Sequence, residues 1–172
     1  GNVVEYTLTI EQTGGSAITV PGRGFLLNNE LTDFTLVWDA ADPNRLEPGK
    51  RPRSSMSPTI VLKDGKPFLA LGSPGGSTII TTVLQTLVNR IDLGMPIDRA
   101  LAAPRATQRN TPKVTAEPGF IAEYGPAMGA FGHQLDPSGD SFTSAAEIGA
   151  ATAIEFGPRG RLTAVSEPTR RG

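Results

Sequence analysis

The sequence predicts an α+β fold whose sheets are largely antiparallel. Two observations support this class: segments typical of strands and of helices are segregated along the chain, and the clearest strand pair is joined by a tight two-residue turn. The 172 residues are enough for about one domain with a buried core, so we expect a single domain over residues 1–172. Glycine (20 residues) and proline (15 residues) are abundant, which predicts long loops.

The first third of the chain is expected to contain little regular structure. Residues 2–13 are rich in β-branched and aromatic side chains with partial alternation, which favours a strand with one solvated face. Residues 24–27 form a short apolar run after several glycines, which predicts the end of a buried strand. Residues 35–53 are rich in Asp, Pro and Gly, which is typical of a surface loop.

A β-hairpin and a long helix are predicted next. Residues 58–63 and 66–71 are apolar runs joined by Asp64 and Gly65, and Asp-Gly between two such runs is a strong hairpin signal. Residues 78–93 carry apolar side chains at helical spacing, which predicts a buried amphipathic helix.

The remaining segments complete the predicted α+β pattern. Residues 97–103 are expected to form a second, short helix that ends before a proline, and a third helix is expected within residues 120–135. Residues 144–156 and 161–166 are typical of a closing pair of strands around a Gly-Pro-Arg-Gly turn.

Composition argues against several classes of function. The 16 Lys and Arg residues are balanced by 17 Asp and Glu residues, so no basic field favours nucleic acid. No apolar run approaches the roughly 18 residues that cross a bilayer, so we expect no membrane insertion by this chain. The sequence has no cysteine, and its one histidine, His133, is expected to be structural or solvent-facing, so we expect no metal site.

Two polar clusters could bind the head group of an amino acid. Glu30 and Asp33 are three residues apart, so one helical turn would point both carboxylates the same way, where they could hold an ammonium group. A simply capped turn explains these residues as well. Ser54 and Ser55 could donate hydrogen bonds to a carboxylate, although a serine-rich turn before a strand is the commoner explanation for such a pair.

A glycine-rich bend precedes the predicted long helix. Gly75 and Gly76 would let backbone N–H groups turn toward one point beside a helix N-terminus, where an oxyanion could be held. The bend is no phosphate loop, because the GxxxxGK[ST] spacing is absent. A tight strand-to-helix turn also needs glycine, so both interpretations stay open here.

In this order and spacing, the segments resemble the small subunit of gamma-glutamyltranspeptidase, a member of the N-terminal-nucleophile hydrolase superfamily. The matching motifs are GFLLNNELTDF (24–34), RPRSSMSPT (51–59), GSPGGS (72–77), APR (103–105) and GH (132–133). The resemblance implies part of an αββα sandwich, a precursor that cleaves itself into two chains, and a threonine nucleophile at the start of the small chain. It implies no cofactor and a periplasmic or secreted location.

The resemblance also implies a role for each polar cluster in binding a gamma-glutamyl donor. Glu30 and Asp33 would bind its α-ammonium, and the hydroxyls of Ser54 and Ser55 would bind its α-carboxylate. Glu11 lies where many relatives carry an asparagine that contacts the α-amino group. We expect these clusters and the glycine bend to surround one hollow of about the size of an amino acid.

The catalytic groups implied by the resemblance are Thr9, Gly75 and Gly76. Thr9 would donate a hydrogen bond to the nucleophile, and the N–H groups of Gly75 and Gly76 would form an oxyanion hole. The acyl group would pass to water or to an amino-acid acceptor. The Thr-Thr-His or Thr-Ala-His start that the resemblance places before Gly1 is absent, so we expect the 172-residue chain to be inactive without that segment and the large subunit.

Two alternatives remain open from the sequence. A side-chain acylase that acts on glutaryl-type groups would use the same fold, but it would not need an ammonium pocket. A non-catalytic fragment that binds amino acids would need the polar clusters but no oxyanion hole. Binding of glutamate without turnover would favour the second alternative.

Overall fold

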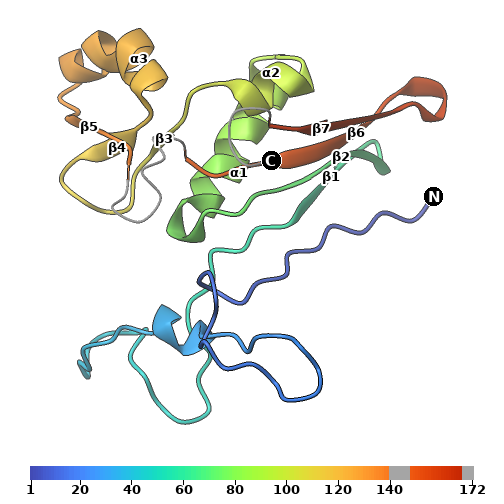
Figure 1. Cartoon of the computed structure of the whole chain (residues 1–172). Helices are drawn as coiled ribbons and strands as arrows, with labels where there is room; N and C mark the ends of the chain where they lie inside the picture. The colour runs from blue at the N-terminus through green and yellow to red at the C-terminus, as the bar shows by residue number, and fades with distance from the viewer. Residues whose placement is uncertain (140–147, 168–172) are drawn as a thin grey trace. The chain divides into compact units, whose positions relative to one another are not determined.

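A computed structural model describes residues 1–139 and 148–167 of the chain. The chain divides into two compact units. The first, here called the sheet unit, comprises Gly1–Thr7 and Met56–Gly172, and the second, the loop unit, comprises Leu8–Ser55. Figure 1 shows that the labelled helices and strands all belong to the sheet unit.

The sheet unit is built on a four-stranded sheet with the strand order β1-β2-β6-β7, in which all neighbours are antiparallel. Its strands are β1 (Thr59–Lys63), β2 (Lys66–Gly72), β6 (Thr152–Phe156) and β7 (Leu162–Ser166). The predicted hairpin is confirmed, and both turn residues, Asp64 and Gly65, have the positive φ that a type I′ turn requires. The predicted closing strands are confirmed as β6 and β7, while residues 144–147 lie outside the described residues.

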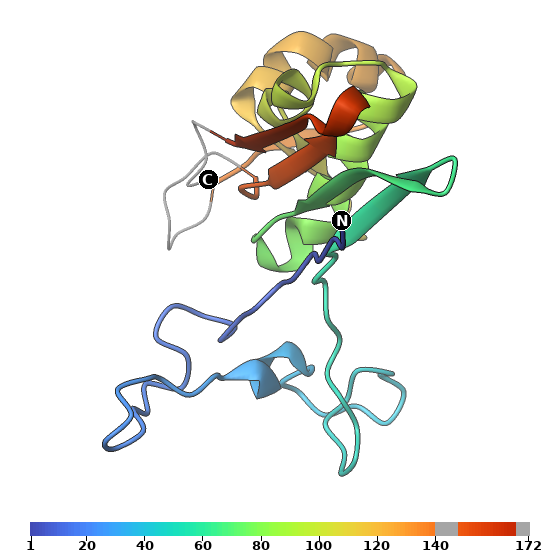
Figure 2. The same cartoon turned by 90° about the vertical axis from the view of Figure 1, so that its right-hand side faces the viewer.

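Helices α1 (Ile79–Leu87) and α2 (Ile97–Ala102) cover one face of this sheet (Figures 1 and 2). A 3-10 turn (Gly76–Thr78) precedes α1 and a π-helical turn (Val88–Asp92) follows it, so the predicted helix over residues 78–93 is confirmed. The predicted second helix is confirmed as α2. The buried core between sheet and helices consists of Leu69, Leu71, Ile79, Val83, Ile97, Leu101, Ala151 and Ala153.

The prediction of a buried amphipathic helix is confirmed for α1, which buries one side and exposes the other. The side chains of Ile80 and Leu84 are 52% and 57% exposed, whereas Thr82 and Thr86 are buried. The buried side thus combines two threonines with Ile79 and Val83, and part of the apolar side of the helix faces away from the sheet. The outward stripe is therefore an apolar surface of the sheet unit.

A second, three-stranded sheet completes the α+β class, which the structure confirms. It has the order β3-β4-β5, with β3 (Ala106–Thr107) antiparallel and β5 (Leu135–Pro137) parallel to β4 (Val114–Ala116). Helix α3 (Pro118–Ala130) connects β4 and β5. The third predicted helix is thus confirmed, although the end of its predicted range forms β5. Among the described residues, no helix has both the length and the apolar character to cross a membrane.

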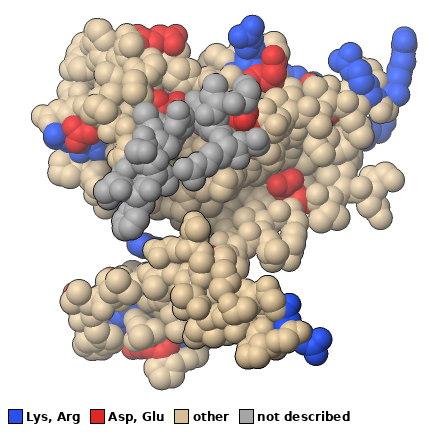
Figure 3. All heavy atoms as spheres, in the orientation of Figure 1, with Lys and Arg blue, Asp and Glu red and all other residues tan. Residues whose placement is uncertain are grey.

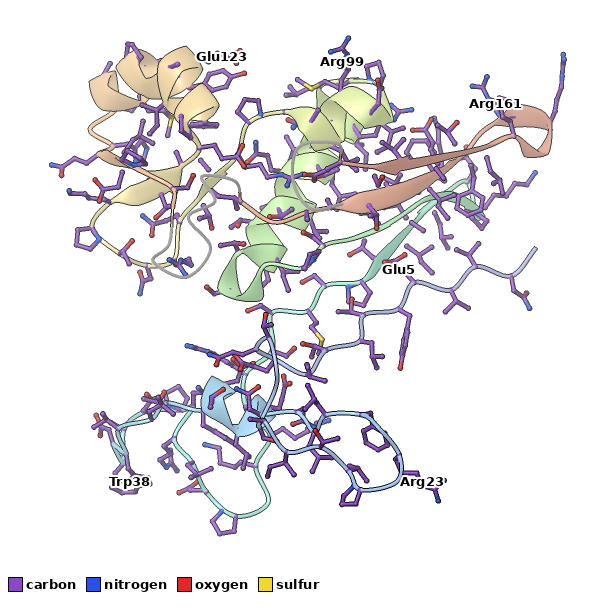
Figure 4. The ribbon with its side chains drawn as sticks, in the orientation of Figure 1. Glu5, Arg23, Trp38, Arg99, Glu123 and Arg161 are labelled. Atoms are coloured by element: carbon purple, nitrogen blue, oxygen red, sulfur yellow. The ribbon has the colours of Figure 1, made fainter. Side chains whose placement is uncertain are left out.

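The prediction of a strand over residues 2–13 is wrong. Residues 1–10 belong to no strand of the described chain, because no described segment forms a ladder with them. Within the sheet unit, Glu5 lines a hollow of about 350 Å³ together with residues of β2, β6 and β7. Burial raises the pKa of Glu5. Figure 4 shows where the Glu5 side chain lies.

The loop unit contains little regular structure. It has one 3-10 helix, η1 (Glu30–Asp33), and two isolated β-bridges, and Phe34 is its only buried hydrophobic residue. The prediction of loop over residues 35–53 is confirmed. The prediction of a buried strand end at residues 24–27 is wrong, because no second layer covers this run and Phe25 is 54% exposed.

Candidate active site

The acidic turn of the loop unit is η1, which holds Glu30 and Asp33 at its two ends. In a 3-10 helix, residues three apart lie on the same side, as the sequence predicts for these two carboxylates. The turn is also capped locally: the Asn28 side-chain oxygen accepts a hydrogen bond from the Glu30 N–H at 3.0 Å. The two interpretations left open by the sequence are therefore compatible, because a capped turn presents the carboxylate pair.

Glu11 is held beside this turn in an unusual backbone conformation. Its φ of +72° lies in the left-handed region, which costs a non-glycine residue about 1–2 kcal/mol. The Glu11 N–H donates to the Thr9 hydroxyl at 2.8 Å. The next residue, Gln12, donates its N–H to the side chain of Asn29 at 3.1 Å, and the Asn29 N–H donates to the Ile10 carbonyl at 3.2 Å. These hydrogen bonds hold Glu11, with its strained backbone, next to η1.

The carboxylates of Glu11, Glu30 and Asp33 form one electrostatic cluster, here called the carboxylate cluster. Partial burial raises the pKa of Glu30, the negative charges of Asp33 and Glu11 raise it further, and a hydrogen bond with Asp33 adds to the effect. One oxygen of Glu11, Oε2, is buried and has no hydrogen-bond partner among the described residues. Such a cluster repels itself when ionised, and a cationic group is the ligand that relieves this repulsion.

Asn44 links the acidic turn to the serine pair. Its side-chain Nδ2 donates to the Asp33 carbonyl at 2.7 Å, and its Oδ1 accepts a hydrogen bond from the Arg53 N–H at 2.9 Å. Arg53 directly precedes Ser54, so one carboxamide joins the backbones that carry both predicted binding groups. No local sequence signal marks Asn44 as a functional residue, because an Asp-Pro-Asn turn indicates only a loop.

The loop unit therefore brings together six of the residues expected to act on a substrate. Ser54 is exposed and Ser55 is half-buried, so both lie at or near the surface of the unit. The six residues are Thr9, Glu11, Glu30, Asp33, Ser54 and Ser55. The other two, Gly75 and Gly76, belong to the sheet unit.

The glycine bend lies at the start of α1, as the sequence predicts. Gly75 and Gly76 have φ values of +141° and +54°. The Gly75 carbonyl accepts hydrogen bonds from both the N–H and the hydroxyl of Thr78, at 3.0 and 2.9 Å. Within the described part of the chain, neither the Gly75 N–H nor the Gly76 N–H donates a hydrogen bond. Two unused N–H groups near a helix N-terminus can stabilise an oxyanion.

Only glycine fits at the first position of this bend. A Cβ on Gly75 would lie 2.7 Å from the Thr78 hydroxyl oxygen and 3.3 Å from the Cα of Gly149. A Cβ on Gly76 would meet nothing within 4 Å, so there only the positive φ favours glycine. The bend is therefore packed backbone against backbone on the Gly75 side.

His133 lies away from the predicted site residues in the chain, at the end of α3. It is exposed, and its N–H donates to the Met128 carbonyl at 3.1 Å. This placement agrees with the expected structural or solvent-facing histidine. In residues 1–139 and 148–167, no group of three or more His, Asp or Glu side chains is arranged to hold a metal ion. On the face drawn in Figure 3, basic and acidic side chains occur in small, interspersed groups.

Comparisons with known proteins connect this geometry to a family. The family model described as gamma-glutamyltranspeptidase matches residues 1–172. The glutathione hydrolase proenzyme of Bacillus subtilis strain 168 is 41% identical over 173 aligned positions, which cover 100% of this chain and 28% of that protein. The chain therefore spans somewhat more than a quarter of the length of this curated relative.

Solved structures agree with this result. A mutant gamma-glutamyltranspeptidase from Helicobacter pylori superposes with a TM-score of 0.84 at 38% identity, and the match covers 99% of this chain and 95% of that chain. A cephalosporin acylase from Bacillus halodurans superposes with a TM-score of 0.76 at 30% identity, covering 91% of this chain and 28% of the acylase.

Proposed function

Because the chain belongs to the gamma-glutamyltranspeptidase family, we propose that it is the small-subunit part of an enzyme that transfers or hydrolyses gamma-glutamyl groups. The proposed donors are glutathione and gamma-glutamyl amides, and the acceptor is water or an amino acid. The observation that carries this proposal is the carboxylate cluster, which Asn44 links to the serine pair.

The carboxylate cluster is suited to the α-ammonium of a gamma-glutamyl donor. Glu30 and Asp33 lie on one side of a 3-10 turn, and Glu11 is held next to them despite its strained φ. Local strain of this kind persists where the surrounding structure enforces it, often at a ligand site. An ammonium donates three hydrogen bonds, so it can satisfy the buried Glu11 Oε2 and neutralise the repulsion that raises the pKa of Glu30.

The serine pair is suited to the α-carboxylate of the same donor. The α-ammonium and α-carboxylate are attached to one carbon, so their binding groups must keep a fixed separation. Asn44 supplies this constraint, because its carboxamide bonds to Asp33 and to Arg53, the neighbour of Ser54. Hydroxyl donors bind a carboxylate through charge-assisted hydrogen bonds.

The acyl-transfer step uses a threonine hydroxyl that the intact enzyme supplies outside this chain. Its oxygen attacks the gamma-carbonyl carbon, its α-amine takes the hydroxyl proton, and the carbonyl electrons move onto the oxygen. The N–H groups of Gly75 and Gly76 stabilise that oxyanion. The leaving amine departs with a proton, and water or an amino acid then attacks the ester. The Thr9 hydroxyl accepts from Glu11 and keeps its own proton for the nucleophile.

A large subunit from the same precursor is part of this proposal. The outward stripe of α1 and the π-helical turn after it support it, because Ile80 and Leu84 of α1 are 52% and 57% exposed and Ile91 of the turn is 48% exposed. A contiguous apolar surface of this kind marks a protein interface. These residues, along α1 and the turn that follows it, give that partner a defined apolar surface to cover.

The test of the proposed function compares two substrates of the intact, processed enzyme. A gamma-glutamyl anilide carries the α-ammonium, and the glutaryl anilide of the same amine lacks only the amino group. We expect kcat/KM to be about 100-fold higher for the gamma-glutamyl anilide, because hydrogen bonds between charged groups contribute roughly 1.5–3 kcal/mol each. Equal or greater kcat/KM for the glutaryl anilide would contradict the proposal.

The likeness to a cephalosporin acylase supports a second candidate, a side-chain acylase on the same fold. The carboxylate cluster argues against it, because a glutaryl-type group has no ammonium and three carboxylates would then face an anionic substrate. The same pair of anilides distinguishes the two candidates. Binding of L-glutamate by the intact protein, with turnover of neither anilide, would instead favour a non-catalytic amino-acid-binding role.

A further inference from the structure

Arg105 is a fully buried charge in the sheet unit, with 1% of its surface exposed. Its guanidinium donates to the carbonyl of Ile148 at 2.7 Å and to the carbonyl of Leu101 at 2.9 Å. It also forms a short ion pair with Glu167, which is itself 1% exposed. A buried guanidinium with these partners is fixed in one orientation.

Two carboxylates extend this network to the backbone around residue 148. Glu117, which is 5% exposed, accepts hydrogen bonds from the N–H groups of Arg105 at 2.9 Å and of Ile148 at 2.7 Å. Glu167 accepts a hydrogen bond from the Ala151 N–H at 2.7 Å. The backbone of Ile148 is therefore held at its carbonyl by Arg105 and at its N–H by Glu117.

Side chains, and not a strand ladder, hold the segment 148–151, here called the clamp segment. In addition to the bonds at Ile148 and Ala151, the Ala150 N–H donates to the hydroxyl of Ser73 at 3.1 Å. The segment directly precedes β6, which begins at Thr152. Its position therefore depends on the charges of Arg105, Glu117 and Glu167 and on the hydroxyl of Ser73.

The clamp segment packs directly against the glycine bend. A Cβ on Gly75 would lie 3.3 Å from the Cα of Gly149, and a Cβ on Gly149 would lie 2.8 Å from both the Ser73 and the Thr82 hydroxyl oxygens. Gly149 has a φ of +69°, so both its conformation and its surroundings require glycine. With two backbones this close, a shift of the clamp segment by a few tenths of an ångström moves the bend.

We propose that Arg105, Glu117 and Glu167 are positioning residues that fix the Gly75 and Gly76 N–H groups through the clamp segment. The inference rests on the proposed function, in which these two N–H groups bind the oxyanion. A buried ion pair contributes little net stability compared with apolar packing of the same volume. We therefore assign this network the role of placing the glycine bend precisely. Oxyanion stabilisation depends steeply on donor position, which gives this placement a catalytic consequence.

The sheet unit offers a matched control pair for this network. The Arg90 side chain donates to both carboxylate oxygens of Glu155 at 2.6 and 3.1 Å, so it too is an arginine–glutamate pair that ends on β6. Glu155 lies opposite Leu69 on β2, whereas Thr152, next to the clamp segment, lies opposite Gly72. The control pair therefore contacts the same strand at its other end, away from the glycine bend.

The test uses the intact, processed enzyme with the variants Arg105→Lys and Glu167→Gln, and with Arg90→Lys and Glu155→Gln as controls. Each variant is assayed for kcat and KM with a gamma-glutamyl anilide and for its melting temperature. Each is also titrated with L-glutamate and with a gamma-boronic acid analogue of glutamate. The boronic acid forms a tetrahedral, negatively charged adduct with the nucleophile, so its affinity reports on the oxyanion site.

We expect Arg105→Lys and Glu167→Gln to lower kcat by about 10- to 100-fold, with KM and glutamate affinity changed less than about threefold. The boronic acid should lose affinity by a factor similar to the loss in kcat. The control variants should stay within about twofold of the parent in kcat and boronate affinity, whatever their melting temperatures.

Equal losses of kcat in both pairs, or a loss confined to KM, would overturn the inference. If Arg105→Lys does not fold, Ser73→Ala tests the same link, because it removes the hydrogen bond from the Ala150 N–H together with the local bond from the Ser73 hydroxyl to the Pro74 carbonyl. It should lower kcat and boronate affinity together. A parent enzyme without activity on gamma-glutamyl anilides would contradict the proposed function. An active parent with unaffected network variants would contradict this inference alone.

Discussion

The side chain of Asn44 donates a 2.7 Å hydrogen bond from Nδ2 to the carbonyl oxygen of Asp33. The oxygen of the same carboxamide accepts a 2.9 Å hydrogen bond from the Arg53 N–H, next to Ser54. One uncharged side chain thus sets the spacing between the carboxylate cluster and the serine pair. This spacing matters because the two groups would bind substituents of a single carbon atom.

Replacing Asn44 with alanine should weaken donor binding without altering the chemistry. The hydrogen bonds to Asp33 and Arg53 are lost, each contributing about 1 kcal/mol, together with a longer 3.5 Å bond to the Thr35 hydroxyl. The kcat/KM for a gamma-glutamyl anilide should therefore fall roughly 30-fold, mostly through KM. The matched control is Lys50→Ala, which removes a 2.7 Å hydrogen bond to Pro43 in the same loop but no contact with Asp33 or Arg53. A similar loss in both variants would show that Asn44 acts only by ordering the loop.

The raised pKa of Glu30 predicts the acid limb of the pH profile. The ionised carboxylate binds the donor's ammonium, so kcat/KM should fall as the pH drops through this raised pKa. Glu11→Gln removes one of the like charges that raise it, so the acid limb should move to lower pH. The measurement is kcat/KM against pH for the parent and for Glu11→Gln. An acid limb that moves to higher pH, or does not move, would contradict the carboxylate cluster.

The raised pKa of Glu30 also predicts that replacing this residue raises the stability of the enzyme while lowering its activity. A carboxyl group whose pKa is higher in the folded than in the unfolded state favours folding when protonated, and this contribution is lost as the pH rises through the folded pKa. Glu30→Gln should therefore raise the melting temperature of the intact enzyme at pH 7, and this gain should shrink toward pH 4. Donor kcat/KM should fall in the same variant. A lower melting temperature at pH 7 would contradict the predicted repulsion.

The glycine bend should tolerate no side chain at its first position. Gly75→Ala places a methyl group 2.7 Å from the Thr78 hydroxyl oxygen, so we expect kcat to fall roughly 100-fold or more, as in the loss of an oxyanion donor. Gly94→Ala is the control: its φ is also positive, at +68°, but a Cβ there meets nothing within 4 Å. It should lower the melting temperature and leave kcat within about twofold of the parent.

The sequence predicts best those features that local chemistry determines. The Asp64–Gly65 turn requires positive φ at both positions, so the two residues alone specify the hairpin. The acidic turn is similar, because a spacing of three residues places Glu30 and Asp33 on one side of any helical turn. The bend at Gly75 and Gly76 follows from the need for glycine between a strand and a helix.

The features that local sequence does not predict depend on distant partners. The expected strand over residues 2–13 has β-type composition, but a strand exists only when another segment pairs with it. The buried side of α1 includes Thr82 and Thr86, whereas Ile80 and Leu84 are exposed, so the apolar periodicity predicts the helix but not which of its sides the sheet covers. The contacts of Asn44 with Asp33 and of Arg105 with Ile148 span 11 and 43 residues, and no local pattern encodes them.

The most direct test of the central claim is a crystal structure of the intact, processed enzyme with the gamma-boronic acid analogue of glutamate bound. We expect the ligand's ammonium to lie within about 3 Å of carboxylate oxygens of Glu30 and Asp33. In the same complex, a boronate oxygen should lie within about 3 Å of the N–H groups of Gly75 and Gly76. A ligand whose ammonium contacts neither carboxylate, or whose boronate oxygens lie away from both glycines, would contradict it.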